Sequence, residues 1–181
     1  MPEPSASRSS TRPDTASGAA FFQVGTEKLI ELSLLTFGLY GFWWTWQQWQ
    51  SLKARGEAVN PWVRTLLSVI WQYDLYRRIA TRTRTEDMAC RWHALRLHGL
   101  FVGFTLVPLW LLATDHPWGL LINLMTLLPN VLVNQSINAI NEKYLPFYEQ
   151  NTELSGRNWA AVVAGVVAWL TLLTLALTSD L

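Results

Sequence analysis

Half of the 181 residues are hydrophobic and only 15% are charged, with 14 basic and 13 acidic side chains giving a formal net charge of +1. Soluble domains carry about 25% charged residues and nucleic-acid-binding proteins usually display a basic stripe, so composition and charge give no reason to expect a nucleic-acid partner. The single cysteine, Cys90, excludes an intramolecular disulfide and a cysteine-based zinc site.

Four long stretches without a charged residue predict membrane-spanning helices. They cover residues 32–52, 97–114, 116–141 and 158–179. The hydrocarbon core of a bilayer is about 30 Å thick and is crossed by roughly 20 mostly apolar helical residues. A chain of 181 residues has too little other material to bury four such helices in a water-soluble core. We therefore expect an all-α, polytopic helical membrane protein with four transmembrane helices plus one interfacial or re-entrant helix.

The N-terminal part is predicted to contain a tail and the first span. Residues 1–20 are rich in Ser, Thr and Pro and have nothing apolar to offset the entropy of ordering, which indicates a disordered tail before a single helical membrane domain over residues 21–181. The first span covers about residues 29–49, where Gly38 and Gly41 allow a kink or a close helix contact. Indole rings favour the headgroup layer. The tryptophans expected there are Trp43, Trp44, Trp46, Trp49, Trp62, Trp118 and Trp159.

Residues 62–78 are apolar but carry several polar side chains. Arg64, Ser68 and Gln72 recur at intervals of four residues and would form one polar stripe on a helix, and Asp74 follows them. This pattern fits an interfacial helix, a re-entrant hairpin arm, or a span whose stripe faces other helices. We favour the interfacial or re-entrant interpretation.

The remaining chain is predicted to hold three further spans. They cover about residues 97–113, 118–133 and 159–178. Pro108 lies inside the second span and Pro129 near the end of the third, and residues 115–117 form a minimal turn between these two spans. The polar loop over residues 134–157 is expected to begin as a helix.

The distribution of lysine and arginine predicts the orientation, because short cytoplasmic loops are enriched in these residues. Whether or not residues 62–78 span, the basic residues of segment 77–96 and of loop 134–157 fall on the side with most of the positive charge. We expect that side to be the cytoplasm and the C-terminus to lie outside. The side of the N-terminus stays open.

No sequence motif points to catalysis. The chain has no Gly-rich phosphate loop, no Gly-x-Ser-x-Gly and no His-Glu-x-x-His, and His93, His98 and His116 do not form a ligand cluster. We therefore expect a non-enzymatic protein that has neither a cofactor nor a metal site.

Two hypotheses for the function remain open. In the first, an arginine-rich cytoplasmic face binds anionic lipid headgroups or another membrane protein, although the same residues also fit the ordinary positive-inside bias. These residues are Arg77, Arg78, Arg82, Arg84, Arg91 and Arg96. In the second hypothesis, a small transporter or channel subunit uses polar residues within the membrane. These are Glu31, Asp74, Asn123, Asn130 and Asn134.

Spacing also predicts local contacts for these polar residues. Glu31 is expected to pair with Lys28 and Asp74 with Arg78, more as structural ion pairs than as functional sites. A row of asparagines is expected to share one helical face that turns into protein or water, since a buried amide without partners costs roughly 1–3 kcal/mol. Its amides either bond to a neighbouring helix or line a wet cavity. The row is Asn123, Asn130, Asn134, Asn138 and Asn141.

Parts of the chain resemble a family of small bacterial multi-spanning inner-membrane proteins of unknown function. The shared pattern is Lys-Leu at residues 28–29, Ser-x-x-Thr-Phe-Gly-Leu-Tyr at residues 33–40, aromatic residues ending in Trp, and Pro-x-x-Arg at residues 61–64. Arg-Arg-Ile at residues 77–79 and the asparagines of residues 134–141 extend it. The resemblance implies a bacterial cytoplasmic membrane as the location and brings no activity, cofactor or catalytic residue with it.

Overall fold

The computed structural model describes residues 19–116, 119–145 and 151–178. Within these ranges the structure consists of α-helices and one 3-10 turn, without a strand, which confirms the predicted all-α class. The predicted disordered tail lies outside the described residues, except for Ala19 and Ala20. The elements are α1 (Thr26–Leu35), α2 (Leu39–Ala54), α3 (Pro61–Leu66), α4 (Ser68–Thr85), α5 (Ala94–Ala113), α6 (Gly119–Asn123), η1 (Leu124–Thr126), α7 (Leu127–Tyr144) and α8 (Gly156–Thr178).

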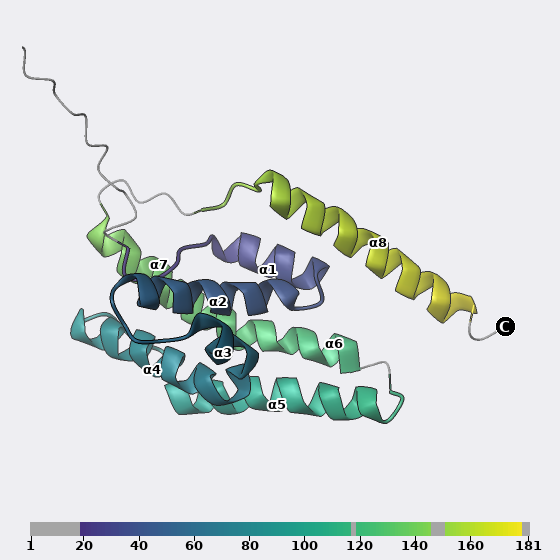
Figure 1. Cartoon of the computed structure of the whole chain (residues 1–181), viewed down its shortest axis with the longest axis horizontal. Coiled ribbons are helices and arrows are strands. Elements are labelled where there is room, and N and C mark those ends of the chain that lie inside the picture. Colours follow the sequence, from purple (N-terminus) through teal and green to yellow (C-terminus); the bar gives the residue numbers. More distant parts are fainter. Residues whose placement is uncertain (1–18, 117–118, 146–150, 179–181) are drawn as a thin grey trace, which may run out of the picture.

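A turn at Phe37 and Gly38 divides the first predicted span into two helices. Both residues adopt the left-handed conformation, with φ angles of 52° and 88°, and the N–H of Gly38 donates to the carbonyl of Ser33 at 2.7 Å. This bond satisfies a carbonyl at the end of α1, and α2 then runs back beside α1 (Figure 1). The prediction of one continuous span over residues 29–49 is therefore wrong, because the break lies inside a run that has no charged residue to mark it.

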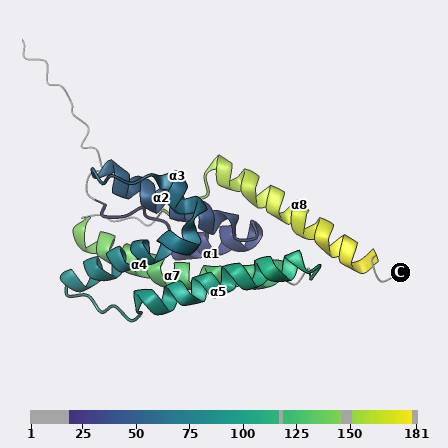
Figure 2. The same ribbon diagram turned by 60° about the horizontal axis from the view of Figure 1, so that its bottom comes forward.

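A second break, at Leu67, separates α3 from α4. Asn60 caps α3 by accepting the N–H groups of Trp62 and Val63, and the chain bends after α3 (Figure 2). The bend is sharp. The Arg64 guanidinium contacts the Asp74 carboxylate at 2.5 Å, whereas ten residues of straight helix would separate their backbones by about 15 Å. The polar stripe predicted for residues 62–78 is therefore interrupted at Leu67.

Two helices are long and apolar enough to cross a bilayer. They are α5 and the continuous helical stretch Gly119–Tyr144, which comprises α6, η1 and α7. The four predicted spans are not confirmed, because α1 and α2 are separate shorter helices and the apolar part of α8, as far as it is described, is Asn158–Thr171.

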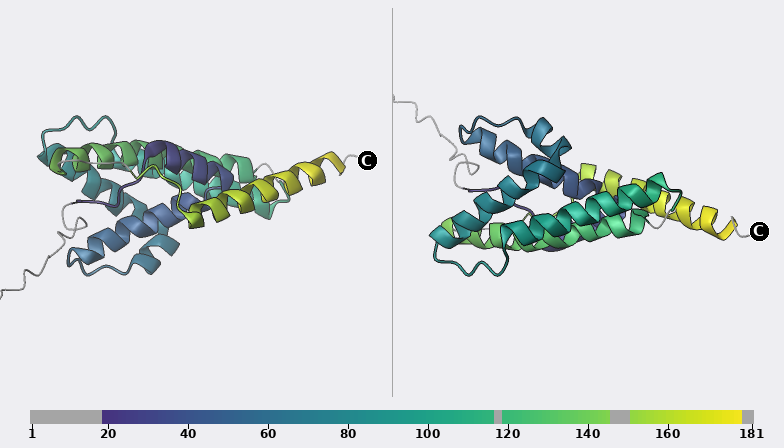
Figure 3. Two further views of the ribbon diagram at one scale, coloured as in Figure 1. Left: turned by 90° about the horizontal axis from the view of Figure 1, so that it is seen from above. Right: turned by 90° about the horizontal axis from the view of Figure 1, so that it is seen from below.

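The second and third predicted spans form an antiparallel pair (Figure 3). Asp115, with a φ of 59°, closes the turn after α5, and the N–H of His116 donates to the carbonyl of Leu111 at 2.8 Å. Gly119 then allows close approach, since a Cβ there would lie 2.6 Å from the carbonyl oxygen of Pro108. The 3-10 turn η1 lies one turn before Pro129, whose missing N–H leaves the carbonyl of Met125 without its usual helical donor.

Several segments meet at one end of the molecule, on the left in Figure 1. Residues 82–96, the C-terminal turn of α7, the C-terminal end of α2 and residues 19–25 all lie there, and we call it the arginine end. The turn after α5 and the C-terminal end of α8 lie at the opposite end (Figures 1 and 2).

The core fills the space between α1, α2, α4 and α7. Its largest side chains include Trp44, Trp49 and Tyr76, all with none of their surface exposed. Trp44 and Trp49 therefore pack inside the protein and do not present a half-buried indole ring to a headgroup layer. Trp62 and Trp159 are exposed, at 58% and 57%, and Trp118 lies outside the described residues.

Helix α8 packs against α1 through small side chains. A Cβ on Gly165 would lie 2.1 Å from the carbonyl oxygen of Leu35, so only glycine permits this approach. Nearby, the Trp169 indole Nε1 donates to the carbonyl of Leu34 at 3.1 Å, and its ring stacks on Phe37 with centroids 4.3 Å apart. The turn between α1 and α2 is thus held by α8.

Candidate functional site

The asparagine row faces protein, as its spacing predicts. Asn130, Asn134, Asn138 and Asn141 are at most 4% exposed, and Asn123 is half-buried. Because α7 supplies four of them at intervals of three and four residues, they form one polar ridge along the side of α7 that meets the rest of the fold.

Asn134 connects α7 to two other parts of the chain. Its Oδ1 accepts a hydrogen bond from the Trp44 indole at 3.1 Å, and its Nδ2 donates to the carbonyl of Val24 at 3.0 Å. The same Nδ2 also lies 3.3 Å from the hydroxyl of Thr26. Both the oxygen and the nitrogen of the Asn134 amide thus have hydrogen-bond partners inside the protein. For this residue, the amide bonds to neighbouring parts of the fold and does not line a wet cavity.

Asn138 and Asn141 bind the segment that precedes α1. Asn138 donates to the carbonyl of Val24 at 2.9 Å, and Asn141 donates to the carbonyl of Phe21 at 3.2 Å while its Oδ1 accepts the N–H of Ala20 at 3.1 Å. Residues 20–24 are not part of a helix or sheet, so these side-chain amides supply hydrogen-bond partners for their backbone groups. They fix residues 20–24 at the arginine end.

The two deeper asparagines contact the helix breaks and α4. Asn123 donates to the carbonyl of Phe37 at 3.3 Å, in the turn between α1 and α2. Asn130 accepts the Tyr76 hydroxyl at 2.8 Å and the Gln72 amide at 3.3 Å through its Oδ1. Gln72 and Tyr76 are partners that no sequence spacing could name, because they lie in another helix.

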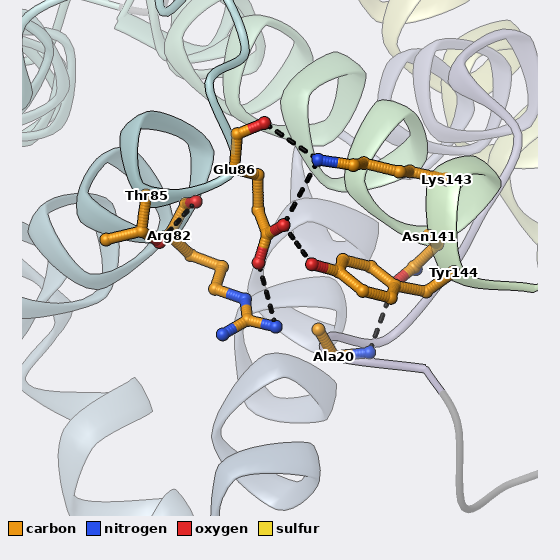
Figure 4. Close-up of polar contacts among 7 residues, drawn as sticks. All are labelled: Ala20, Arg82, Thr85, Glu86, Asn141, Lys143 and Tyr144. Atoms are coloured by element: carbon orange, nitrogen blue, oxygen red, sulfur yellow. Dashed lines mark hydrogen bonds and ion pairs between the residues drawn. The ribbon is translucent and has the colours of Figure 1, made fainter.

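One part of the arginine end is closed by charge pairs (Figure 4). Glu86, after α4, accepts from Arg82 at 3.0 Å and from Lys143 at 3.2 Å, and the Tyr144 hydroxyl also donates to it. The Tyr144 hydrogen bond, and then Lys143 and Arg82, hold the pKa of the Glu86 carboxyl below its ordinary value. Arg82 pairs with Glu86 at the end of α4 and also lies over the ring of Tyr144 of α7, 5.4 Å from its centroid.

Asp74 lies at the centre of a second network. It contacts Arg64 at 2.5 Å and Arg78 at 3.1 Å, which confirms the predicted pair with Arg78, and Arg78 also reaches Glu57 at 2.5 Å. The Arg64 guanidinium is stacked between the rings of Trp49 and Trp71, at 4.5 and 4.4 Å. This arrangement fastens the bend between α3 and α4 to α2, and both arginine contacts of Asp74 use its Oδ2.

Glu31 has a different environment from the one predicted. It is exposed and makes no ion pair with Lys28. Lys28 is 4% exposed and donates instead to the side chain of Asn151 at 2.8 Å and to the backbone carbonyl of Glu153 at 2.5 Å. The predicted pair is wrong because Lys28 points to the segment before α8, whose proximity cannot be deduced from local spacing.

Four of the six predicted arginines have no side-chain partner among the described residues: Arg77, Arg84, Arg91 and Arg96. Three of these, all but Arg77, line one open groove of about 480 Å³ between the end of α4 and the start of α5. His93, Trp92 and Leu132 line it as well. The Trp92 indole donates to the Ser136 hydroxyl at 2.9 Å, which fixes the loop on α7.

No group of three His, Cys, Asp or Glu side chains that could hold a metal ion occurs in the part of the chain that the structure describes. No family model matches the chain, and neither a curated protein sequence nor a solved structure matches it. The resemblance to bacterial inner-membrane proteins therefore stays a prediction.

Proposed function

We propose that the chain is a multi-pass protein of the bacterial cytoplasmic membrane. The surface of the two long helices supports this proposal, since only 17% of the apolar window of α5 and 33% of that of Gly119–Tyr144 is buried. A core helix of a soluble protein would be mostly buried. The exposed side chains of α5 are large and apolar, which suits acyl chains. They include Leu95, Leu100, Leu106, Leu109 and Trp110.

In the proposed orientation the arginine end faces the cytoplasm. Arginines at the N-terminal end of α5 and Lys143 at the C-terminal end of α7 mark the same end of the antiparallel pair, in keeping with positive-inside bias. Because residues 20–24 are bonded to α7 at this end, the N-terminal segment lies on the cytoplasmic side. The α1–α2 and α3–α4 pairs then enter the membrane and return, as re-entrant hairpins.

The function we propose is the binding of anionic lipid headgroups in the groove lined by Arg84, Arg91 and Arg96. The observation that carries it is that these three arginines line one open groove and have no acidic partner among the described residues, whereas Arg78 and Arg82 are paired. Guanidinium groups match phosphate oxygens with paired, charge-assisted hydrogen bonds. Arginines that contributed only to the positive-inside bias would not have to line the same groove.

Apolar side chains of the same groove favour a lipid over a soluble anion. Leu97 and Leu132 line it, and Leu132 is 42% exposed on the outer face of α7. In this proposal a phospholipid places its phosphate on the arginines and the start of its acyl chains along Leu132, because Leu97 is only 5% exposed. Both parts of an amphipathic ligand would thus be matched.

Native mass spectrometry of the detergent-purified full chain tests this function with added phosphatidylglycerol and phosphatidylcholine. We expect preferential binding of phosphatidylglycerol, and a loss of about tenfold or more in that affinity for the Arg84→Gln/Arg91→Gln variant, since charged hydrogen bonds contribute roughly 1.5–3 kcal/mol each. Lys53→Gln/Arg77→Gln removes the same charge from exposed residues outside the groove and is the matched control.

Equal losses in the two variants would contradict a specific headgroup site and leave only general charge attraction. Unchanged phosphatidylglycerol binding in both variants would contradict headgroup binding in this groove. In that case, co-purification of a protein partner that depends on Arg84 and Arg91 would favour a second membrane protein as the ligand of this face.

A further inference from the structure

Three interruptions of helical structure meet around one partly open cavity, whose lining includes the exposed side chains of Leu39 and Phe42. The turn at Phe37 and Gly38, the start of α4 after Leu67, and the 3-10 turn η1 all border a cavity of about 190 Å³ between α2, α5 and the Gly119–Tyr144 stretch. Within a bilayer, non-helical backbone is tolerated only where it is buried in protein or lines a polar cavity. The three breaks therefore fit a membrane protein only if this cavity is lined by protein or contains water.

Hydroxyl groups from three helices line the cavity. Thr45 donates to the carbonyl of Gly41 at 3.1 Å, Thr105 to that of Phe101 at 2.8 Å, and Thr126 to that of Asn123 at 2.7 Å. Each hydroxyl hydrogen is thus used within its own helix, which leaves oxygen lone pairs as acceptors. One lone pair of Thr45 also accepts the Gln72 amide at 3.5 Å.

Further polar groups of the lining have no partner among the described residues. Asn130 is 3% exposed, and because its Oδ1 is held by Tyr76 and Gln72, its Nδ2 is a free donor at the cavity wall. Ser68 offers a hydroxyl at the start of α4. Behind this wall, the Oε1 of the fully buried Gln72 also lacks a partner. A buried polar atom without a hydrogen-bond partner is unfavourable when it stays dry.

The lining has no charged side chain, although it has donors and acceptors. Besides the polar groups, it contains Phe37, Leu39, Phe42 and Phe101. An ion that enters such a site loses its hydration without gaining a counter-charge, which is costly at membrane depth. The volume equals that of about six waters at roughly 30 Å³ each, which is enough for a molecule of a few heavy atoms.

We propose that this cavity is hydrated and binds small uncharged polar molecules of the size of glycerol or urea while it excludes ions. The proposal rests on the membrane placement and is independent of lipid binding at the arginine end. The apolar rings of the wall would cover the carbon skeleton, and the amide of Asn130 with the threonine hydroxyls would bond the polar groups.

The test uses single cysteines in the full chain, reconstituted in liposomes with Cys90 replaced by serine. Thr105→Cys reports on the cavity, Thr114→Cys on the aqueous end of α5, and Thr171→Cys on the exposed face of α8. The side chains of all three threonines donate to backbone carbonyls of their own helix, so the replacements are matched. The probes are 2-hydroxyethyl methanethiosulfonate, which is neutral, and 2-sulfonatoethyl methanethiosulfonate, which is anionic.

For each reagent, the rate of modification of Thr105→Cys is divided by its rate at Thr114→Cys. We expect this ratio to be within about tenfold of one for the neutral reagent, and at least about tenfold smaller for the anionic reagent than for the neutral one. Thr171→Cys should react with neither reagent. Glycerol should slow the neutral reaction at Thr105→Cys alone. Ser68→Cys repeats the measurement from another helix if Thr105→Cys does not fold.

Two results would overturn the proposal. If the cavity cysteines are as unreactive to the neutral reagent as Thr171→Cys, the cavity is dry. If both reagents react equally well after scaling, the cavity admits ions. Rapid reaction of Thr171→Cys would instead contradict the membrane placement, so that failure is distinguishable from the other two.

Discussion

The indole Nε1 of Trp44 donates to the Oδ1 of Asn134 at 3.1 Å, and both side chains are completely buried although 90 positions separate them in the chain. This bond joins α2, the returning arm of the first helical hairpin, to the longest helical stretch of the fold. From the sequence alone, Trp44 is predicted to lie in the headgroup layer and Asn134 is one of the polar residues predicted within the membrane; in the structure the two form one buried hydrogen bond.

Replacing Asn134 by leucine should lower the free energy of unfolding by roughly 1–3 kcal/mol, because the Trp44 N–H loses its partner in a place that water does not reach. Gln135→Leu changes an exposed amide on the next position of α7 and should have little effect. Thermal unfolding in detergent checks the pair. Equal Tm values for Asn134→Leu and the parent would contradict the structural role of this asparagine.

Gly165→Ala should destabilise the packing of α8 on α1. The added Cβ would lie 2.1 Å from the carbonyl oxygen of Leu35, so α8 must move, at a cost of about 1–3 kcal/mol. Gly103→Ala adds the same group to α5 where nothing lies within 4 Å, and it should be neutral or stabilising by about 0.5–1 kcal/mol. Denaturant unfolding of the two variants measures the difference, and a harmless Gly165→Ala would exclude this close approach.

The two acidic residues of the transport hypothesis should behave differently. Asp74→Asn removes the charge shared by Arg64 and Arg78 and should cost roughly 1–3 kcal/mol of stability. Glu31→Gln alters an exposed side chain and should stay within about 0.5 kcal/mol of the parent. Unfolding in detergent gives both values. A stable Asp74→Asn variant that lost only a transport activity would favour the transporter hypothesis.

Acid should weaken the contact between Glu86 and α7. The Tyr144 hydrogen bond lowers the pKa of the folded-state carboxyl below its ordinary 4.5, with further help from Lys143 and Arg82. A lowered pKa means that the stabilisation is complete above the ordinary value and is lost as the pH falls through the folded-state value. Glu86→Gln should therefore reduce Tm at neutral pH, and its difference from the parent should shrink below about pH 4.5. A difference that does not depend on pH would contradict this ionisation.

The helical class and the asparagine face follow from the sequence because they depend on local composition and on a repeat of three to four residues. The Asp74–Arg78 pair follows from the same periodicity. By contrast, the break at Phe37 is invisible to charge and hydropathy. A bulky residue in the left-handed conformation is unfavourable by itself, and here the ring of Trp169 and the amide of Asn123 stabilise it from distant helices.

The arginines also show which features follow from local sequence and which depend on long-range contacts. Six of them within twenty residues predict a basic end, yet only the folded chain reveals that Arg78 and Arg82 have acidic partners while Arg84, Arg91 and Arg96 share a groove. Likewise, the buried position of Lys28 depends on Asn151, more than a hundred residues away. Long-range contacts of this kind cannot be deduced from spacing along one segment.

We propose that α5 crosses the bilayer with its arginine end in the cytoplasm, and this placement underlies both proposals above. The most direct measurement labels two single cysteines in a Cys90→Ser background with a membrane-impermeant thiol reagent: Ala89→Cys, just before α5, and Thr114→Cys, just after it. In right-side-out vesicles Thr114→Cys should be labelled and Ala89→Cys protected, and inverted vesicles should give the reverse. Labelling of both cysteines from the same side would contradict the claim.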